Sequence, residues 1–129
     1  MILDTTFVID LLKNQYNAIY KLKQLEEENV QYGIATPTIY ELWSGLISLE
    51  KSEKEKQKTI SLIKEQIVYI LDEESAEETG KIDGELIKKG LTIDPEDCMI
   101  AGIAMANNQK VLTGDPHFKR IEGLDVDEY

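Results

Sequence analysis

The sequence has few of the features that secreted and membrane proteins carry. Cys98 is the only cysteine among 129 residues, so no internal disulfide can form and a reducing environment is indicated. No apolar run approaches the roughly 20 residues of a membrane helix. The opening stretch MILDTTFVIDLL has neither the basic region nor the small-residue cleavage site of a secretory signal. We therefore expect a soluble, cytoplasmic protein with no membrane association.

Positive charge is also scarce. The 14 Lys and Arg residues are outnumbered by 25 Asp and Glu residues, which gives a formal net charge of −11. This balance argues against a protein that holds nucleic acid through a broad basic face. It does not exclude a nuclease, because bound cations and a local lysine patch can carry the phosphates. It favours a basic partner segment through complementarity, although acidic charge also keeps a domain soluble.

Short apolar runs alternate with helical periodicity along the whole chain. Strands are expected at residues 2–3, 34–35, 68–71 and 111–112, with a short edge strand at 124–126. Helices are expected over residues 7–12, 19–25, 36–47, 73–89 and 95–104, and a solvated segment at 50–58 begins a helix that reaches residue 67. This alternation predicts an α/β protein with right-handed βαβ crossovers. The expected architecture is a single domain, residues 1–129, folded as a three-layer α/β/α sandwich around a mostly parallel sheet of four to five strands.

Four acidic residues fall where such a fold binds its ligands, outside the carboxyl ends of the strands. Asp4 directly follows the first strand, Glu41 lies near the start of the helix that leaves the second, and Asp115 follows the fourth strand by two residues. Asp97 lies in the first turn of a helix that must run antiparallel to the strand it precedes. We therefore expect all four side chains at one edge of the sheet.

Carboxylates gathered in one place repel one another. At an effective dielectric constant near 20, two like charges ~5 Å apart cost about 3 kcal/mol. A shared divalent cation removes that cost, and hard oxygen ligands suit Mg²⁺ or Mn²⁺. Such a cation activates a water for the hydrolysis of a phosphate ester. The acids therefore predict metal-assisted phosphate chemistry that needs no protein nucleophile.

Each acid also has a purely structural interpretation. Asp4, Asp94 and Asp115 each precede a helix that they can cap, with Asp97 as the capping-box partner of Asp94. Thr38 and Glu41 have the spacing of a capping box. Ser or Asn would cap equally well, so capping alone does not predict four acids on one edge.

The other polar or reactive side chains are assigned ordinary roles. We expect Cys98 in the core. Trp43 is expected to pack or to contact a partner, and Asp10 to face solvent. His117, Lys13, Lys119 and Arg120 are expected at the surface.

Four motifs together resemble the PIN-domain nucleases, and more closely the small VapC-type toxins of toxin–antitoxin pairs. In chain order they are LDTTFVIDLL, TIYELWSG, DCMIAGIAMA and VLTGDPHFKRIEGLDV. The resemblance covers nearly the whole chain. It implies a metal-dependent endoribonuclease, the toxin of such a pair, that hydrolyses RNA phosphodiester bonds with a metal-activated water.

The resemblance also implies roles for individual residues. By position, Asp4, Glu41, Asp97 and Asp115 match the family's catalytic and metal-binding acids, with Mg²⁺ or Mn²⁺ as cofactor. Thr6 and Thr113 match hydroxyl residues that line the pocket, and Gly102 stands where many relatives have Ala. The family further implies an RNA substrate, a cognate antitoxin whose C-terminal segment covers the acidic pocket, and a homodimer.

Two other functions compete with this one. Haloacid-dehalogenase-like phosphatases also place a nucleophilic aspartate after the first strand, which here is Asp4, but they carry a second aspartate where this chain has Thr6. A non-catalytic PIN-like interaction module would keep the fold and lose the metal ligands. Retention of all four acids argues against such a module.

Overall fold

A computed structural model describes residues 1–129 and places five short strands in one sheet. The strands are β1 (Ile2–Leu3), β2 (Gly33–Ala35), β3 (Ile67–Tyr69), β4 (Val111–Leu112) and β5 (Val126–Asp127). Their order across the sheet is β3-β2-β1-β4-β5, and every neighbouring pair is parallel. This arrangement confirms the expected parallel sheet.

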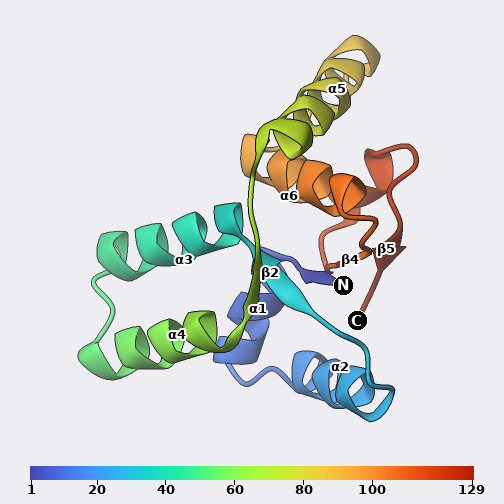
Figure 1. The fold of residues 1–129 in the computed structure, drawn as a ribbon. Coiled ribbons are helices and arrows are strands. Elements are labelled where there is room, and N and C mark those ends of the chain that lie inside the picture. The colour runs from blue at the N-terminus through green and yellow to red at the C-terminus, as the bar shows by residue number, and fades with distance from the viewer.

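Helices cover both faces of the sheet (Figure 1). They are α1 (Thr5–Leu12), α2 (Tyr16–Glu27), α3 (Thr36–Ser48), α4 (Glu53–Glu65), α5 (Glu73–Lys89) and α6 (Pro95–Ala106), followed by the 3-10 helix η1 (Pro116–Arg120). Side chains alternate between the two faces along each strand. Ile2 therefore packs with α5 and α6, whereas its neighbour Leu3 packs with α1, α2 and α3. These two apolar layers confirm the three-layer α/β/α sandwich.

The strand order brings the carboxyl ends of β1 and β4 side by side. The chain moves in one direction from β1 through β2 to β3, then crosses back to form β4 on the other side of β1. Leu3 pairs with Leu112, and the backbone N–H of Asp4 donates to the carbonyl of Leu112 at 2.9 Å. The residues that follow the two strands, Asp4 and Thr113, therefore emerge side by side. In parallel sheets this point of reversal is where ligands bind.

Several expected element boundaries differ from the structure. The strand expected at 68–71 is β3, which begins at Ile67 and ends at Tyr69. The fourth helix ends at Glu65 and does not reach residue 67, because Gln66 is extended and Ile67 pairs with Gly33 in β3. The last strand begins at Val126 and not at residue 124, because Gly123 has a φ of +83° and the chain turns there. Val126 then pairs with Val111.

The apolar side chains of α3 and β3 are only partly buried. Leu42 and Leu46 are buried, but Trp43 and Ile47 on the same helix are 43% and 64% exposed. Strand β3 lies at the edge of the sheet, and its Val68 is 40% exposed. The segment with the strongest strand composition is therefore the least covered strand, because composition does not reveal which strand becomes an edge.

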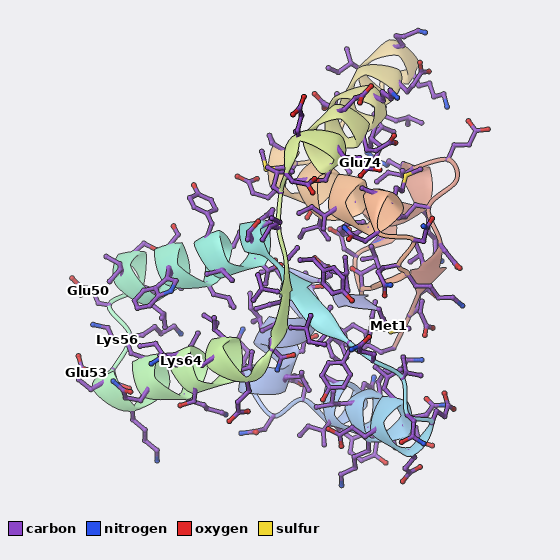
Figure 2. All side chains as sticks on the ribbon, viewed as in Figure 1. Met1, Glu50, Glu53, Lys56, Lys64 and Glu74 are labelled. Atoms are coloured by element: carbon purple, nitrogen blue, oxygen red, sulfur yellow. The ribbon has the colours of Figure 1, made fainter.

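The charged segment between α3 and α4 lies in solvent, as expected. Figure 2 shows Glu50 and Glu53 at the far end of this helix pair, away from the sheet. Both side chains are exposed. No helix combines the length and the apolar character that crossing a membrane requires.

Candidate active site

Asp4 is the most enclosed acid of the candidate site. It occupies the N-cap position of α1 and is only 1% exposed. Its Oδ1 accepts from the backbone N–H of Thr5 at 2.7 Å. Its Oδ2 accepts from Thr6 Oγ1 at 2.7 Å and from Thr113 Oγ1 at 2.5 Å. Asp4 therefore caps a helix, as one interpretation predicted, and also forms the centre of a hydroxyl network at the sheet edge.

The loop after β4 connects this network to Asp115. Thr113 Oγ1 accepts from the backbone N–H of Asp115 at 2.9 Å while it donates to Asp4. Asp115 caps η1, and its Oδ1 accepts from the backbone N–H of His117 at 2.9 Å. Nδ1 of His117 lies 2.8 Å from the same oxygen. The expected capping role of Asp115 is confirmed, and His117 is an exposed turn residue that contacts it.

Glu41 reaches the site through Thr5, a residue to which the sequence pattern gave no role. Thr5 Oγ1 donates to Glu41 Oε1 at 2.7 Å and lies 3.0 Å from Thr38 Oγ1. The expected capping box of Thr38 and Glu41 is wrong, because α3 already begins at Thr36 and Thr38 is a fully buried residue of its first turn. The only sequence feature that could have indicated this role is the pair of threonines, Thr5 and Thr6, directly after Asp4.

Asp97 lies in the first turn of α6 and is partly buried. Asp94 occupies the N-cap position of that helix but makes no side-chain capping hydrogen bond. Its expected capping role is therefore wrong. Burial is the main cause of the raised pKa values of Asp97 and Glu41, and the charge of Asp94 adds to both. Asp94 is thus an additional acid at the margin of the site.

The site acids influence one another electrostatically. Burial, followed by the charges of Asp4, Asp115 and Glu41, raises the pKa of Asp97 to about 7. Burial raises the pKa of Glu41, and the charge of Asp4 adds to that rise against the hydrogen bond from Thr5. Burial also raises the pKa of Asp4 against the hydrogen bonds that it accepts. The structure therefore brings the four predicted side chains into one region of mutual repulsion.

The donor chemistry of this region fits a hard divalent cation, since every candidate ligand is a carboxylate oxygen. As the side chains stand, no group of three or more His, Cys, Asp or Glu residues is positioned to hold a metal ion. Every buried side-chain nitrogen or oxygen already has a hydrogen-bond partner. Asp4 has three donors for about four lone-pair positions, which leaves one position on Oδ1 for a cation.

A groove of about 410 Å³ adjoins the site at Glu41. Its lining includes Ile9, Leu42 and Leu46, which give an apolar surface between α1 and α3. Three lysines also line it, Lys13, Lys51 and Lys58. The remaining lining residues are Leu12, Gly45, Leu49, Glu55 and Thr59. The groove therefore combines aliphatic side chains with lysines next to an acidic site.

The structure also shows the surroundings of four residues outside this network that the sequence assigns to the core or to the surface. Cys98 is buried, as expected, and burial raises the pKa of its thiol to about 12. The expectation that Asp10 faces solvent is wrong, because its Oδ2 accepts from Tyr129 Oη at 2.5 Å. Arg120 donates to the carbonyl of Thr92 at 3.1 Å, and Lys119 pairs with Glu128. The two cations after His117 are therefore engaged within the protein.

Comparison with known proteins places this geometry in a recognised family. The family model of the PIN domain matches residues 1–124. The chain is 30% identical over 128 residues to the tRNA(fMet)-specific endonuclease VapC of Salmonella typhimurium, covering 98% of this chain and 96% of that protein. It is 25% identical to ribonuclease VapC2 of Rickettsia felis, with the same coverage.

Solved structures of VapBC proteins match this fold as well. VapBC2 from Rickettsia felis bound to a DNA fragment from its promoter contains a chain that matches with a TM-score of 0.89 at 25% identity. The match covers 99% of this chain and 97% of that one. The DNA-bound VapBC of Salmonella typhimurium gives a TM-score of 0.84 at 30% identity and covers 98% and 96%. The same arrangement of strands and helices therefore recurs over essentially the full length of these proteins.

Proposed function

This chain belongs to the PIN-domain family and is a VapC-type ribonuclease, and we propose that it hydrolyses RNA with Mg²⁺ or Mn²⁺ held by Asp4, Glu41, Asp97 and Asp115. The observation that carries the proposal is the grouping of these acids in a partly buried site, where burial first and then the charges of Asp4, Asp115 and Glu41 raise the pKa of Asp97 to about 7. Repulsion between such charges is costly in a folded protein unless a cation offsets it. Strongly perturbed acids grouped at one edge are also typical of catalytic sites.

The protein's own groups prepare the ligands. Thr6 and Thr113 donate to Oδ2 of Asp4, so they fix the orientation of the carboxylate and favour its charged form. Thr5 does the same for Glu41. These hydroxyl groups act as the outer contacts that orient metal ligands. A bound cation would acidify a water for attack on the phosphorus and stabilise the charge that develops on the phosphate.

No protein nucleophile competes for the reaction. Asp4 is 1% exposed and its oxygens accept three hydrogen bonds, which disfavours attack on phosphorus by this carboxylate. Cys98 is buried and its raised pKa keeps the thiol neutral. Hydrolysis by water is the remaining route, and it fits a site built from acids and hydroxyl groups.

The test is cleavage of a short RNA by wild-type protein and by Asp4→Asn and Asp97→Asn at saturating Mn²⁺. We expect both variants to lose at least about 100-fold in rate, because each removes a ligand charge from the reaction centre. Glu27→Gln is the matched control, since Glu27 is an exposed acid outside the site. Wild-type rates in well-folded Asn variants would refute the assignment.

We further propose a cognate antitoxin as partner and a homodimer as the assembled form. The support for an antitoxin is that the matching solved structures are VapBC complexes. Charge supports it too, because a net charge of −11 and an acidic site attract a basic segment. The support for a second copy is the exposed apolar surface of α3, where Tyr40 and Ile47 are each 64% exposed.

The two rival functions remain distinguishable by experiment. A phosphatase would form an aspartyl-phosphate at Asp4, so a trapped beryllofluoride adduct at Asp4 would support the phosphatase function. The burial of Asp4 and the presence of Thr6 at the second aspartate position weigh against it. A non-catalytic module would bind no Mn²⁺, so calorimetric titration of the folded protein separates it from the nuclease.

A further inference from the structure

We propose that Tyr129 is a positioning residue of the ribonuclease site, and that it holds α1 and the loop after β4 at the spacing where Thr6 and Thr113 both reach Asp4. The inference rests on the proposed function. Tyr129 itself touches neither the substrate nor a metal ligand in this role. It acts through the two segments that supply the hydroxyl donors.

The contacts of Tyr129 join these two segments. On α1, the phenol Oη donates to Asp10 Oδ2 at 2.5 Å. The ring meets Phe7 edge to face, with centroids 4.7 Å apart and planes at 81°. On the other side the ring lies against Gly114, where an added Cβ would stand 3.2 Å from Oη and 3.3 Å from the ring carbons. One aromatic side chain is thus in contact with α1 and with the residue directly after Thr113.

The backbone that carries Tyr129 is itself held in place. The backbone N–H of Thr113 donates to the carbonyl of Asp127 at 3.0 Å, which extends the pairing of β4 with β5 beyond the strands. Lys21 on α2 pairs with Asp127 at 3.0 Å. The tyrosine therefore extends from a fixed strand end, and its ring position is determined by Phe7, Asp10 and Gly114 together.

The geometry of the donors explains why this spacing matters. Thr6 and Thr113 both donate to Oδ2 of Asp4, although one comes from α1 and the other from the end of β4. A relative shift of the two segments lengthens at least one of these hydrogen bonds. Burial and the hydrogen bond to Asp10 raise the pKa of Tyr129, so the phenol stays a donor to α1. Tyr129 is therefore coupled to the Asp4 network through contacts on both sides.

The test compares Tyr129→Ala and Tyr129→Phe with wild-type protein. Cleavage of a short RNA is measured at saturating Mn²⁺, with kcat and KM separated, together with the dissociation constant of Mn²⁺ alone and the midpoint of thermal unfolding. We expect Tyr129→Ala to lower kcat about 10-fold or more with KM within about twofold, because misplacing a catalytic group by a fraction of an ångström affects the chemical step. We expect it also to weaken Mn²⁺ binding.

The conservative variant separates positioning from general destabilisation. Tyr129→Phe keeps the packing on Phe7 and Gly114 and should recover most of the lost rate and most of the Mn²⁺ affinity. Lys119→Ala is the matched control, because it removes the Lys119–Glu128 ion pair of the same tail without touching α1. It should leave kcat unchanged. If Tyr129→Ala fails to fold, Asp10→Ala removes the acceptor on α1 and should give a smaller loss in kcat and in Mn²⁺ affinity.

Two results would overturn the inference. One is a folded Tyr129→Ala protein, or Asp10→Ala in its place, with wild-type kcat and wild-type Mn²⁺ affinity. The other is a loss in rate that only matches the fraction of unfolded protein. If wild-type protein binds Mn²⁺ but cleaves no RNA, the ribonuclease assignment fails separately, and the Mn²⁺ affinities of the variants then decide the role of Tyr129.

Discussion

Thr113 donates to Asp4 at 2.5 Å across 109 positions of sequence, and both residues emerge from adjacent parallel strands. This hydroxyl and carboxylate are both almost completely buried, at 1% exposure each. The pair joins the two halves of the candidate site, because Thr113 also accepts from the backbone of Asp115. A single side-chain hydroxyl thus connects an acid after β1 with an acid after β4.

Replacement of Thr113 should therefore reduce the stability of the fold. Thr113→Val keeps the shape of the side chain but removes the donor to Asp4 and the acceptor for Asp115. We expect the free energy of unfolding to fall by about 1–3 kcal/mol, since a buried carboxylate loses a hydrogen bond. Urea unfolding with excess chelator measures the effect. Thr92→Val, at an exposed threonine, should change the free energy by less than about 0.5 kcal/mol.

Asp97→Asn should stabilise the metal-free protein above neutral pH. The folded pKa of Asp97 is raised to about 7, so the folded state holds a proton that the unfolded state has released. The cost of ionising Asp97 is absent below its unfolded pKa, grows as the pH rises towards 7, and is fully present above that value. Allowing for solvent screening of this partly buried group, we expect a gain of about 1–2 kcal/mol near pH 8.

The pH dependence is the decisive part of that experiment. Urea unfolding of wild-type and Asp97→Asn protein in the presence of chelator should give free energies that converge as the pH falls towards about 4. Glu27→Gln, at an exposed acid, should show no such convergence. A constant difference at all pH values would mean that the substitution acts through packing and not through the charge of Asp97.

Metal binding should release protons near neutral pH. A cation bound by Asp97 favours its ionised form, so the pKa that stands near 7 without metal must fall on binding. Calorimetric titration with Mn²⁺ in buffers of different ionisation enthalpy measures the number of protons released. We expect a net release near pH 7 that disappears in Asp97→Asn. Equal heats in all buffers for wild-type protein would contradict Asp97 as a ligand.

The crossing of α5 and α6 requires glycine at position 102. A Cβ on Gly102 would overlap Thr79 Oγ1 and would lie 2.8 Å from the carbonyl oxygen of Ser75. Gly102→Ala should therefore lower the free energy of unfolding by about 1–3 kcal/mol, although alanine is the better helix former. Gly84→Ala in α5 is the matched control, because its Cβ meets nothing within 4 Å. That variant should gain up to about 1 kcal/mol, and thermal unfolding distinguishes the two.

The alternation of short apolar runs with helical periodicity determined the fold class and the edge at which the acids lie. Asp4 and Asp115 follow strands, and Asp97 begins a helix that must return antiparallel, so chain direction alone placed them together. Residue type at fixed positions also indicated the capping role of Asp4. These features are local or depend only on the order of elements, and for that reason they can be read from the sequence.

Only the tertiary structure decided which side chains meet across long separations. The role of Thr5 towards Glu41, the contact of Tyr129 with Asp10, and the close approach at Gly102 all depend on how segments pack. The same is true of β3, whose composition indicated a strand but not the edge position that leaves it exposed. Spacing along a chain encodes periodicity and direction, whereas distances between non-neighbouring segments arise only when the whole core has packed.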